Sequence, residues 1–192
     1  INGGIIMTNF DLLKLLMDKK VADSFQFFTS CQYKLDMAEL SYNALKNLIK
    51  KYQEEETEVI NKVFEDAKRT GKGTYRLHKN VVDFFGIEID TTVAIEKVFM
   101  EIMGLLHNFF DTFAQWINSS LFGEQALPIK RASLVNVINK MSAFPEYTDQ
   151  FITDFTNITA NQNYFYVADF NNTQKHRYQL YVQNKFDLFS VQ

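Results

Sequence analysis

The chain is 192 residues long, and 46% of its residues are hydrophobic and 15% aromatic. This composition excludes an intrinsically disordered protein and is sufficient for one ordinary domain with its own core. The net charge of −3 excludes a broad electrostatic attraction to nucleic acid, although it leaves room for a local basic patch.

The single cysteine, Cys31, can form neither an internal disulfide nor a CxxC metal site, which favours a reducing, cytoplasmic location. We expect no metal and no cofactor. No stretch reaches the roughly eighteen uncharged apolar residues of a membrane span, so we expect no membrane partner. Residues 1–7 lack the basic start of a signal peptide. Met7-Thr8-Asn9 resembles a natural start, so residues 1–6 are interpreted as added or disordered residues.

The first third of the chain has the periodicity of helices. Thr8 or Asn9 can cap a first helix over residues 10–20. Residues 36–39, DMAE, have the form of a capping box, which either starts a new helix or lies inside a longer one. Because no Gly or Pro follows before residue 71, we predict one long helix from Met37 to Arg69, ended by Gly71.

Three further interpretations concern stretches within or after that helix. The acidic run of residues 54–58 predicts a solvated face, with neighbouring lysines available for i,i+4 pairs. Residues 71–74, GKGT, are interpreted as a loop, since they lack the spacing of a nucleotide-binding loop. Residues 81–86, VVDFFG, are interpreted as a short helical turn stopped by Gly86.

The stretch from Asp90 to Phe122 predicts the central helix of a bundle. Its apolar side chains recur at three- and four-residue spacing and cover nearly half the helix circumference; they include Val98, Ile102, Leu105, Phe109 and Trp116. Gly104 is expected to permit close approach of another helix. His107, one turn before Asp111, is either a catalytic or metal-binding imidazole or a partly buried side chain bonded to its neighbour.

The last third is predicted to hold shorter elements. Ser133 caps a helix over residues 134–141, Pro145 begins another, and residues 161–163 break it. Residues 164–172 are ambiguous between a last helix and an extended run. Residues 179–192 alternate in polarity, which indicates an extended segment with a weak hairpin turn at residues 184–185. The lack of a polar tail at Gln192 suggests a truncated product.

These patterns together predict an all-α protein. We expect a helical bundle of five to seven helices with a short extended or β-hairpin-like C-terminal segment. The bundle should form a single domain over residues 7–178, followed by the extended segment.

One polar cluster near the C-terminus contains groups that phosphodiester chemistry needs. Its members are two amides, two cations and an imidazole: Asn171, Asn172, Lys175, Arg177 and His176. A histidine titrates near neutral pH and can move protons, and cations stabilise charge developing on phosphate. The alternative interpretation is an Asn-rich turn with a solvated basic flank.

The cluster resembles the polar R-N-x-x-x-H type motif of the HEPN superfamily of helical bundles. The resemblance implies a dimeric, metal-independent ribonuclease of toxin or defence type. Asn172 matches the second polar position and His176 the histidine, whereas Asn171 stands at the position of the arginine. The resemblance implies that Lys175 or Arg177 would then supply the missing positive charge.

Two functions follow as hypotheses. In the first, Asn171, Asn172 and His176 form a catalytic site, with Lys175 and Arg177 binding RNA or a nucleotide, and RNA is cleaved without metal. In the second, the protein is a non-catalytic helical module that binds a protein partner or associates with itself as a homodimer. The surplus of 19 Phe and 9 Tyr residues favours this second hypothesis, because some rings should remain exposed as interface anchors.

Overall fold

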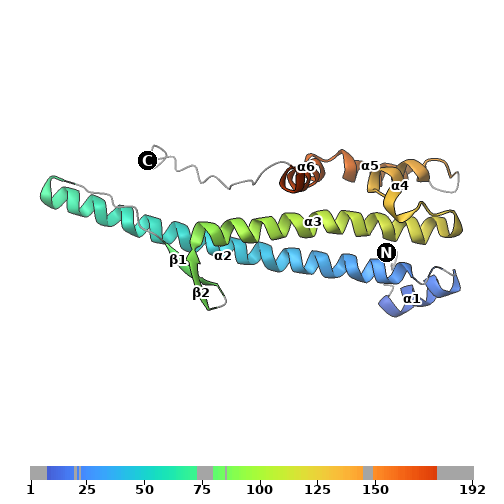
Figure 1. The fold of residues 1–192 in the computed structure, drawn as a ribbon, viewed down its shortest axis with the longest axis horizontal. Coiled ribbons are helices and arrows are strands. Elements are labelled where there is room, and N and C mark those ends of the chain that lie inside the picture. Colours follow the sequence, from blue (N-terminus) through green and yellow to red (C-terminus); the bar gives the residue numbers. More distant parts are fainter. Residues whose placement is uncertain are drawn as a thin grey trace, which may run out of the picture. The chain divides into compact units, whose positions relative to one another are not determined.

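A computed structural model describes residues 8–19, 21, 23–72, 80–84, 86–144 and 149–176. Within these ranges it contains six α-helices and one β-hairpin (Figure 1), which confirms the predicted all-α helical fold class. In chain order they are α1 (Asn9–Asp18), α2 (Ser24–Thr70), β1 (Val81–Phe84), β2 (Ile87–Asp90), α3 (Thr91–Phe122), α4 (Leu134–Met141), α5 (Asp149–Ala160) and α6 (Gln162–His176). Two short 3-10 turns, Gly123–Gln125 and Ile129–Arg131, connect α3 to α4. None of the helices described combines the length and the apolar character that crossing a membrane requires.

Local signals in the sequence set several helix boundaries. Thr8 begins α1 with a capping box, in which its hydroxyl accepts from the Asp11 backbone nitrogen at 3.2 Å and its own backbone nitrogen donates to the Asp11 carboxylate at 3.0 Å. The Thr8 hydroxyl also donates to the Asp11 carboxylate at 2.7 Å, and this bond, together with the one from the Thr8 backbone nitrogen, lowers the pKa of Asp11. The predicted cap at Ser133 is confirmed, since its side chain accepts from the Asn136 backbone nitrogen.

Helix α2 settles the alternative left open by its sequence. It begins at Ser24 rather than Met37, so the DMAE stretch lies inside a longer helix. It ends at Thr70, and Gly71 follows with a φ of 69°, as a C-terminal glycine cap requires. The acidic run is not uniformly solvated: Glu56 is buried and accepts from the Asn80 side-chain nitrogen at 3.1 Å.

The predicted helical turn at residues 81–86 is wrong. Residues 81–84 form β1, which pairs with β2 in an antiparallel hairpin, with Val81 opposite Asp90 and Phe84 opposite Ile87. The β-branched residues of both strands favour extended backbone. Gly86 has a φ of 83°, a conformation that two-residue hairpin turns require. The hairpin predicted at residues 184–185, like the extended segment 179–192, lies outside the described residues.

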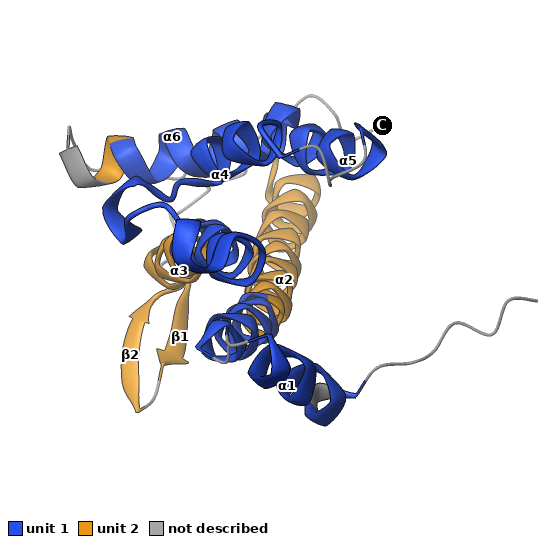
Figure 2. Cartoon of the chain, turned by 90° about the vertical axis from the view of Figure 1, so that its right-hand side faces the viewer, with its two compact units in different colours: residues 1–38, 103–172 blue, residues 39–102, 173–192 orange. Residues whose placement is uncertain are grey.

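The chain divides into two compact units (Figure 2). Unit 1 contains residues 1–38 and 103–172, and unit 2 contains residues 39–102 and 173–192. Both long helices, α2 and α3, therefore contribute residues to each unit.

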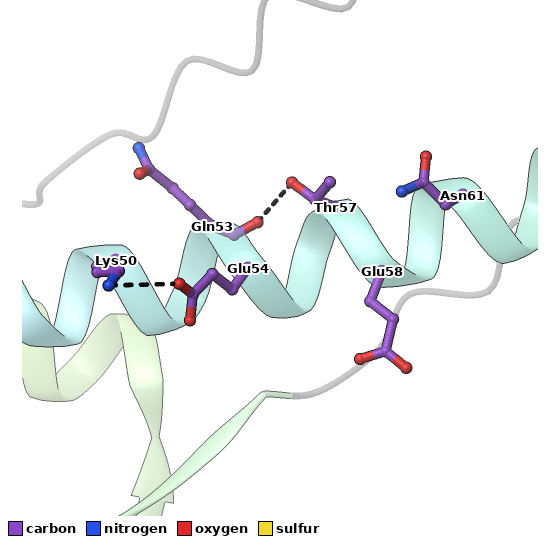
Figure 3. Close-up of a pocket in the computed structure, with 6 residues that line it drawn as sticks. All are labelled: Lys50, Gln53, Glu54, Thr57, Glu58 and Asn61. Atoms are coloured by element: carbon purple, nitrogen blue, oxygen red, sulfur yellow. Dashed lines mark hydrogen bonds and ion pairs between the residues drawn. The ribbon is translucent and has the colours of Figure 1, made fainter.

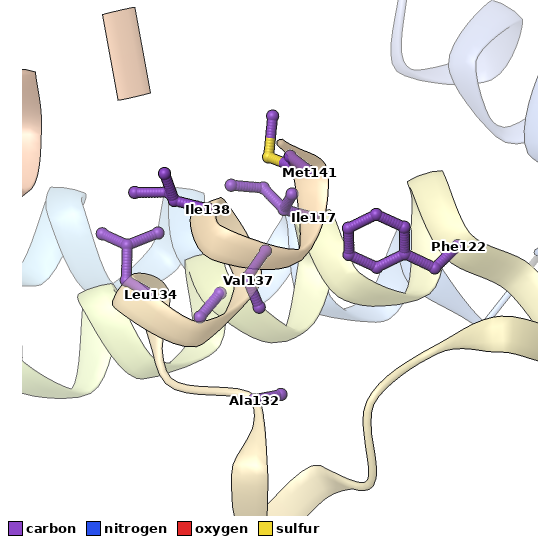
Figure 4. Close-up of a cluster of buried hydrophobic side chains, with 8 residues drawn as sticks. Ile117, Phe122, Ala132, Leu134, Val137, Ile138 and Met141 are labelled. Carbon is purple, nitrogen blue, oxygen red and sulfur yellow. The ribbon is translucent and has the colours of Figure 1, made fainter. Parts of the chain in front are cut away.

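The core of unit 1 lies between the second half of α3 and α4 (Figure 4). The side of α4 that bears Leu134, Val137 and Met141 is fully buried. The complete buried cluster is Ala114, Ile117, Phe122, Ala132, Leu134, Val137, Ile138 and Met141. Apolar residues at three- and four-residue spacing thus place one face of each helix in this core.

Aromatic rings extend this core from α3 to three other helices. The Trp116 ring lies 5.2 Å from that of Phe28 on α2, and the Phe113 ring lies 5.8 Å from that of Phe155 on α5. Phe110 meets Tyr164 on α6 edge to face at 4.9 Å. The prediction that α3 is a central helix is therefore confirmed for unit 1. The expectation that Gly104 permits close approach of another helix is wrong, since a Cβ placed there would meet no atom within 4 Å among the described residues.

Unit 2 packs the first turns of α3 against its own stretch of α2. Ala94, Ile95 and Val98 of α3 are buried, as is Leu45 of α2. Polar contacts add to this packing: the Ser41 hydroxyl donates to Glu101 at 3.2 Å. The Lys97 ammonium lies 4.9 Å from the centre of the Phe84 ring, so a cation–π contact joins the hairpin to α3.

Candidate functional site on helix α6

Helix α6 carries most of the predicted polar cluster. The segment that was ambiguous between helix and extended chain is helical, and the Asn161 side chain begins it by accepting from the Asn163 backbone nitrogen at 2.8 Å. Asn171 and Asn172 lie in its last two turns, and the backbones of Lys175 and His176 complete it. The side chains of Lys175 and His176 and the whole of Arg177 lie outside the described residues.

Asn171 is directed into the protein. It is 5% exposed, and its side-chain nitrogen donates to the backbone carbonyls of Met103 at 2.9 Å and of Val167 at 3.1 Å. The first bond joins α6 to α3, and the second spans one turn of α6. A buried amide with both N–H groups bonded in this way has a structural use that is independent of any substrate.

Asn172 has the opposite environment, although it is the next residue. Successive helical residues are rotated by about 100°, so the burial of Asn171 leaves Asn172 exposed. Phe165 and Asp169 precede Asn172 by seven and three residues and are also exposed, so the three side chains lie on the same side of α6. Position 176, four residues after Asn172, belongs to the same side of the helix. This side of α6 therefore combines an aromatic ring, a carboxylate and an amide.

The solvent-facing side of α6 is more aromatic than the sequence reasoning anticipated. Phe165 and Tyr166 are 54% and 58% exposed. Their rings contact neighbours on the same helix: Phe165 lies 5.9 Å from Tyr164, and Tyr166 lies 6.3 Å from Phe170. The available signal was the uninterrupted run YFY, because consecutive aromatic residues cannot all face one side of a helix.

His107 and Asp111 form the pair that their spacing suggested. The His107 Nδ1 lies 3.4 Å from an Asp111 carboxylate oxygen, and the histidine is partly buried. Tyr164 lies close by, and its pKa is raised by burial and further by the negative charge of Asp111. Among the residues described, no three His, Cys, Asp or Glu side chains come together as a metal site would require.

A groove in unit 1 lies beside this pair. Its volume is about 400 Å³. It is lined by Phe27, Asp111, Thr112, Gln115, Ile129, Lys130, Ala132 and Ser133. The Gln115 side-chain nitrogen donates to the Ile129 carbonyl at 3.0 Å, and Thr112 accepts from the Lys34 ammonium at 2.8 Å. Much of its polar lining is thus already engaged within the protein.

A second hollow, of about 420 Å³, lies on α2 (Figure 3). All six described lining residues belong to that one helix: Lys50, Gln53, Glu54, Thr57, Glu58 and Asn61. Lys50 pairs with Glu54 at 3.7 Å, and the Thr57 hydroxyl donates to the Gln53 carbonyl at 2.7 Å. These are ordinary contacts between neighbours on a helix surface.

The single cysteine is not placed as a nucleophile. Cys31 is buried, and burial raises the pKa of its thiol to about 11. The thiol is consequently protonated at neutral pH, whereas nucleophilic reactions of cysteine require the thiolate.

Comparison of the chain with protein-family models, with curated proteins and with solved structures finds no match. The resemblance to the HEPN superfamily therefore stays a prediction from the sequence motif.

The contrast between Asn171 and Asn172 generates a stability prediction. Asn171→Ala removes both bonds from a buried amide and should lower the free energy of unfolding by about 1–2 kcal/mol. Asn172→Ala is the matched control, because it makes the same substitution on the same helix at an exposed position. It should change the free energy of unfolding by less than about 0.5 kcal/mol. Urea denaturation followed by circular dichroism measures both. Equal effects of the two substitutions would contradict the structural role of Asn171.

Proposed function

We propose that this protein is a non-catalytic helical module that acts by binding another macromolecule, and that a second copy of itself is one such partner. The observation that carries the proposal is the row of large apolar side chains exposed on α2. The row consists of Leu35, Tyr42 and Ile49, which are exposed and recur every seven residues on one side of the helix; Tyr33 and Leu40 are also exposed, on the opposite side. Exposed apolar side chains aligned in this way are typical of interaction sites, and tyrosine is enriched at their centres.

Two further observations favour binding over catalysis. Asn171 uses its side-chain N–H groups to bond backbone carbonyls, so fewer groups of the polar cluster are free to act on a substrate. Cys31 is buried with a raised pKa, which removes the one thiol as a nucleophile. The proposal includes a cytoplasmic location, because a single cysteine suits a reducing compartment.

Self-association tests this proposal. Light scattering over a range of protein concentrations should give a molar mass that rises above that of the monomer. Tyr42→Lys should weaken association about tenfold or more, because it removes an exposed ring and adds a charge that must be desolvated. Phe64→Lys is the control, since Phe64 is an exposed ring nearer the C-terminal end of the same helix. A wild-type protein that stays monomeric at every concentration would contradict the proposed self-association.

RNA binding at the end of α6 is a second candidate function, and it would make the protein a metal-independent ribonuclease of HEPN type. It is favoured by the exposure of Asn172 one helical turn before His176, on the line that also bears Phe165. Exposed rings can stack on bases, and an amide can hold a phosphate oxygen or an imidazole. In this proposal His176 moves the proton, and Lys175 and Arg177 neutralise phosphate.

Incubation of labelled RNA with the protein in EDTA tests this second candidate. Wild type should bind RNA at low salt and cleave it slowly, and His176→Ala and Asn172→Ala should each reduce cleavage at least tenfold. Asn163→Ala, an exposed asparagine at the other end of α6, should have no effect. Equal cleavage by wild type and His176→Ala would assign the activity to a contaminant, and absence of binding would exclude the RNA function.

A further inference from the structure

We infer that two copies of this chain pair through α2, with the two helices antiparallel and a twofold axis close to Tyr42. The inference rests on the self-association proposed above and assigns it a surface and an orientation. Antiparallel here means that the N-terminal end of one α2 lies beside the C-terminal end of the other.

A line of residues that could contact a partner runs along α2. Leu35, Tyr42 and Ile49 recur every seven residues, and Glu39 and Lys46 lie between them at four- and three-residue spacing. Spacing of this kind places all five on one side of a helix. Their positions are fixed by the geometry of α2, which is a single uninterrupted helix. These five residues are called the α2 seam.

The α2 seam is accessible to a partner. Leu35, Tyr42 and Ile49 are 44%, 53% and 37% exposed. The Lys46 ammonium lies 5.5 Å from the centre of the Tyr42 ring, which places these two seam residues side by side at the surface.

The buried line of α2 is separate from the seam. Cys31, Ala38 and Leu45 also recur every seven residues, and each lies four residues before a residue of the seam. Four residues correspond to a rotation of about 40° around the helix, so the seam flanks the buried line rather than coinciding with it. Packing of α2 against the described residues of its own chain therefore leaves the seam exposed.

The α2 seam is complementary to a second copy of itself that runs in the opposite direction. If Tyr42 faces the second copy's Tyr42, then Leu35 faces the second copy's Ile49, and apolar side chains meet at both ends. The same reversal brings Glu39 to within one residue, about 1.5 Å along the helix axis, of the level of the second copy's Lys46, and symmetry repeats this ion pair. Asp36 and Lys50, both exposed beside the seam, come to within two residues, about 3 Å along the axis, of the same level.

The charges also decide between the two possible orientations. A parallel pairing in register would place Glu39 against Glu39 and Lys46 against Lys46, and like charges at a helix interface are unfavourable. Reversal replaces both repulsions with attractions. Tyr33 and Leu40 are exposed too, yet their line along the helix continues through Asn47 and contains no such charge pattern.

Charge reversal at the α2 seam tests the inference by sedimentation equilibrium. Glu39→Lys alone and Lys46→Glu alone should each raise the dissociation constant of the dimer about tenfold, because like charges then face each other twice. The double variant Glu39→Lys/Lys46→Glu should recover wild-type affinity. An equimolar mixture of the two single variants should form a heterodimer, since every facing pair in it has opposite charges.

The controls are Glu58→Lys and Lys62→Glu, which reverse the charges of an exposed ion pair on the same helix outside the seam and should leave the dissociation constant unchanged. If wild type dimerises but the single variants dimerise equally well, or their mixture forms no heterodimer, the antiparallel α2 pairing is wrong and self-association stands. If wild type remains monomeric, the proposed self-association fails, and the α2 pairing fails with it.

Discussion

Contacts between aromatic rings on α3 and its neighbours are the constraint on which the rest of unit 1 depends. Phe110, Phe113 and Trp116 occupy successive turns of α3 and meet rings from α6, α5 and α2, respectively. Each ring buries a large apolar area and packs with restricted geometry, so these contacts set both the closeness and the angle of the neighbouring helices. Helix α4 completes the unit on aliphatic side chains of the same half of α3.

This packing determines what the polar cluster on α6 can do. Because Tyr164 and Val167 turn toward the protein interior, Asn171, four residues after Val167, must follow them. Its amide then bonds the Met103 carbonyl and joins α6 to the backbone of α3. Asn172 is left on the solvent side with Phe165 and Asp169. The orientation of α6 about its own axis thus gives Asn171 a structural role and leaves the adjacent Asn172 at the surface.

The sequence predicted those parts of the fold that depend on local chemistry or on long periodicity. Thr8, Ser133 and Gly71 mark helix ends because their side chains or backbone freedom act within one turn. The α3 helix was predictable because its apolar pattern extends over 32 residues. The hairpin was not predictable, because VVDFF is as apolar as a buried helical turn and the strand pairing that decides between them is not visible locally.

The candidate site was predictable only in part, for a related physical reason. The sequence shows amides and cations near residue 171, but it does not show which of these side chains are buried. Their burial depends on which side of α6 packs against α3. The burial of Glu56 within an otherwise charged run has the same origin, since its partner Asn80 lies 24 residues away in sequence. The α2 seam, too, is recognisable only once α2 is known to continue through residues 36–39 without a break.

The single tryptophan provides the most direct measurement of the central claim that rings on α3 organise unit 1. Trp116 lies between the rings of Phe28 and Phe113, and its indole nitrogen is buried. Native fluorescence should therefore peak at a shorter wavelength than in the urea-unfolded chain and resist quenching by acrylamide, and Phe28→Ala should increase that quenching. Native emission and quenching equal to those of the unfolded chain would show that Trp116 is in water and would contradict the account.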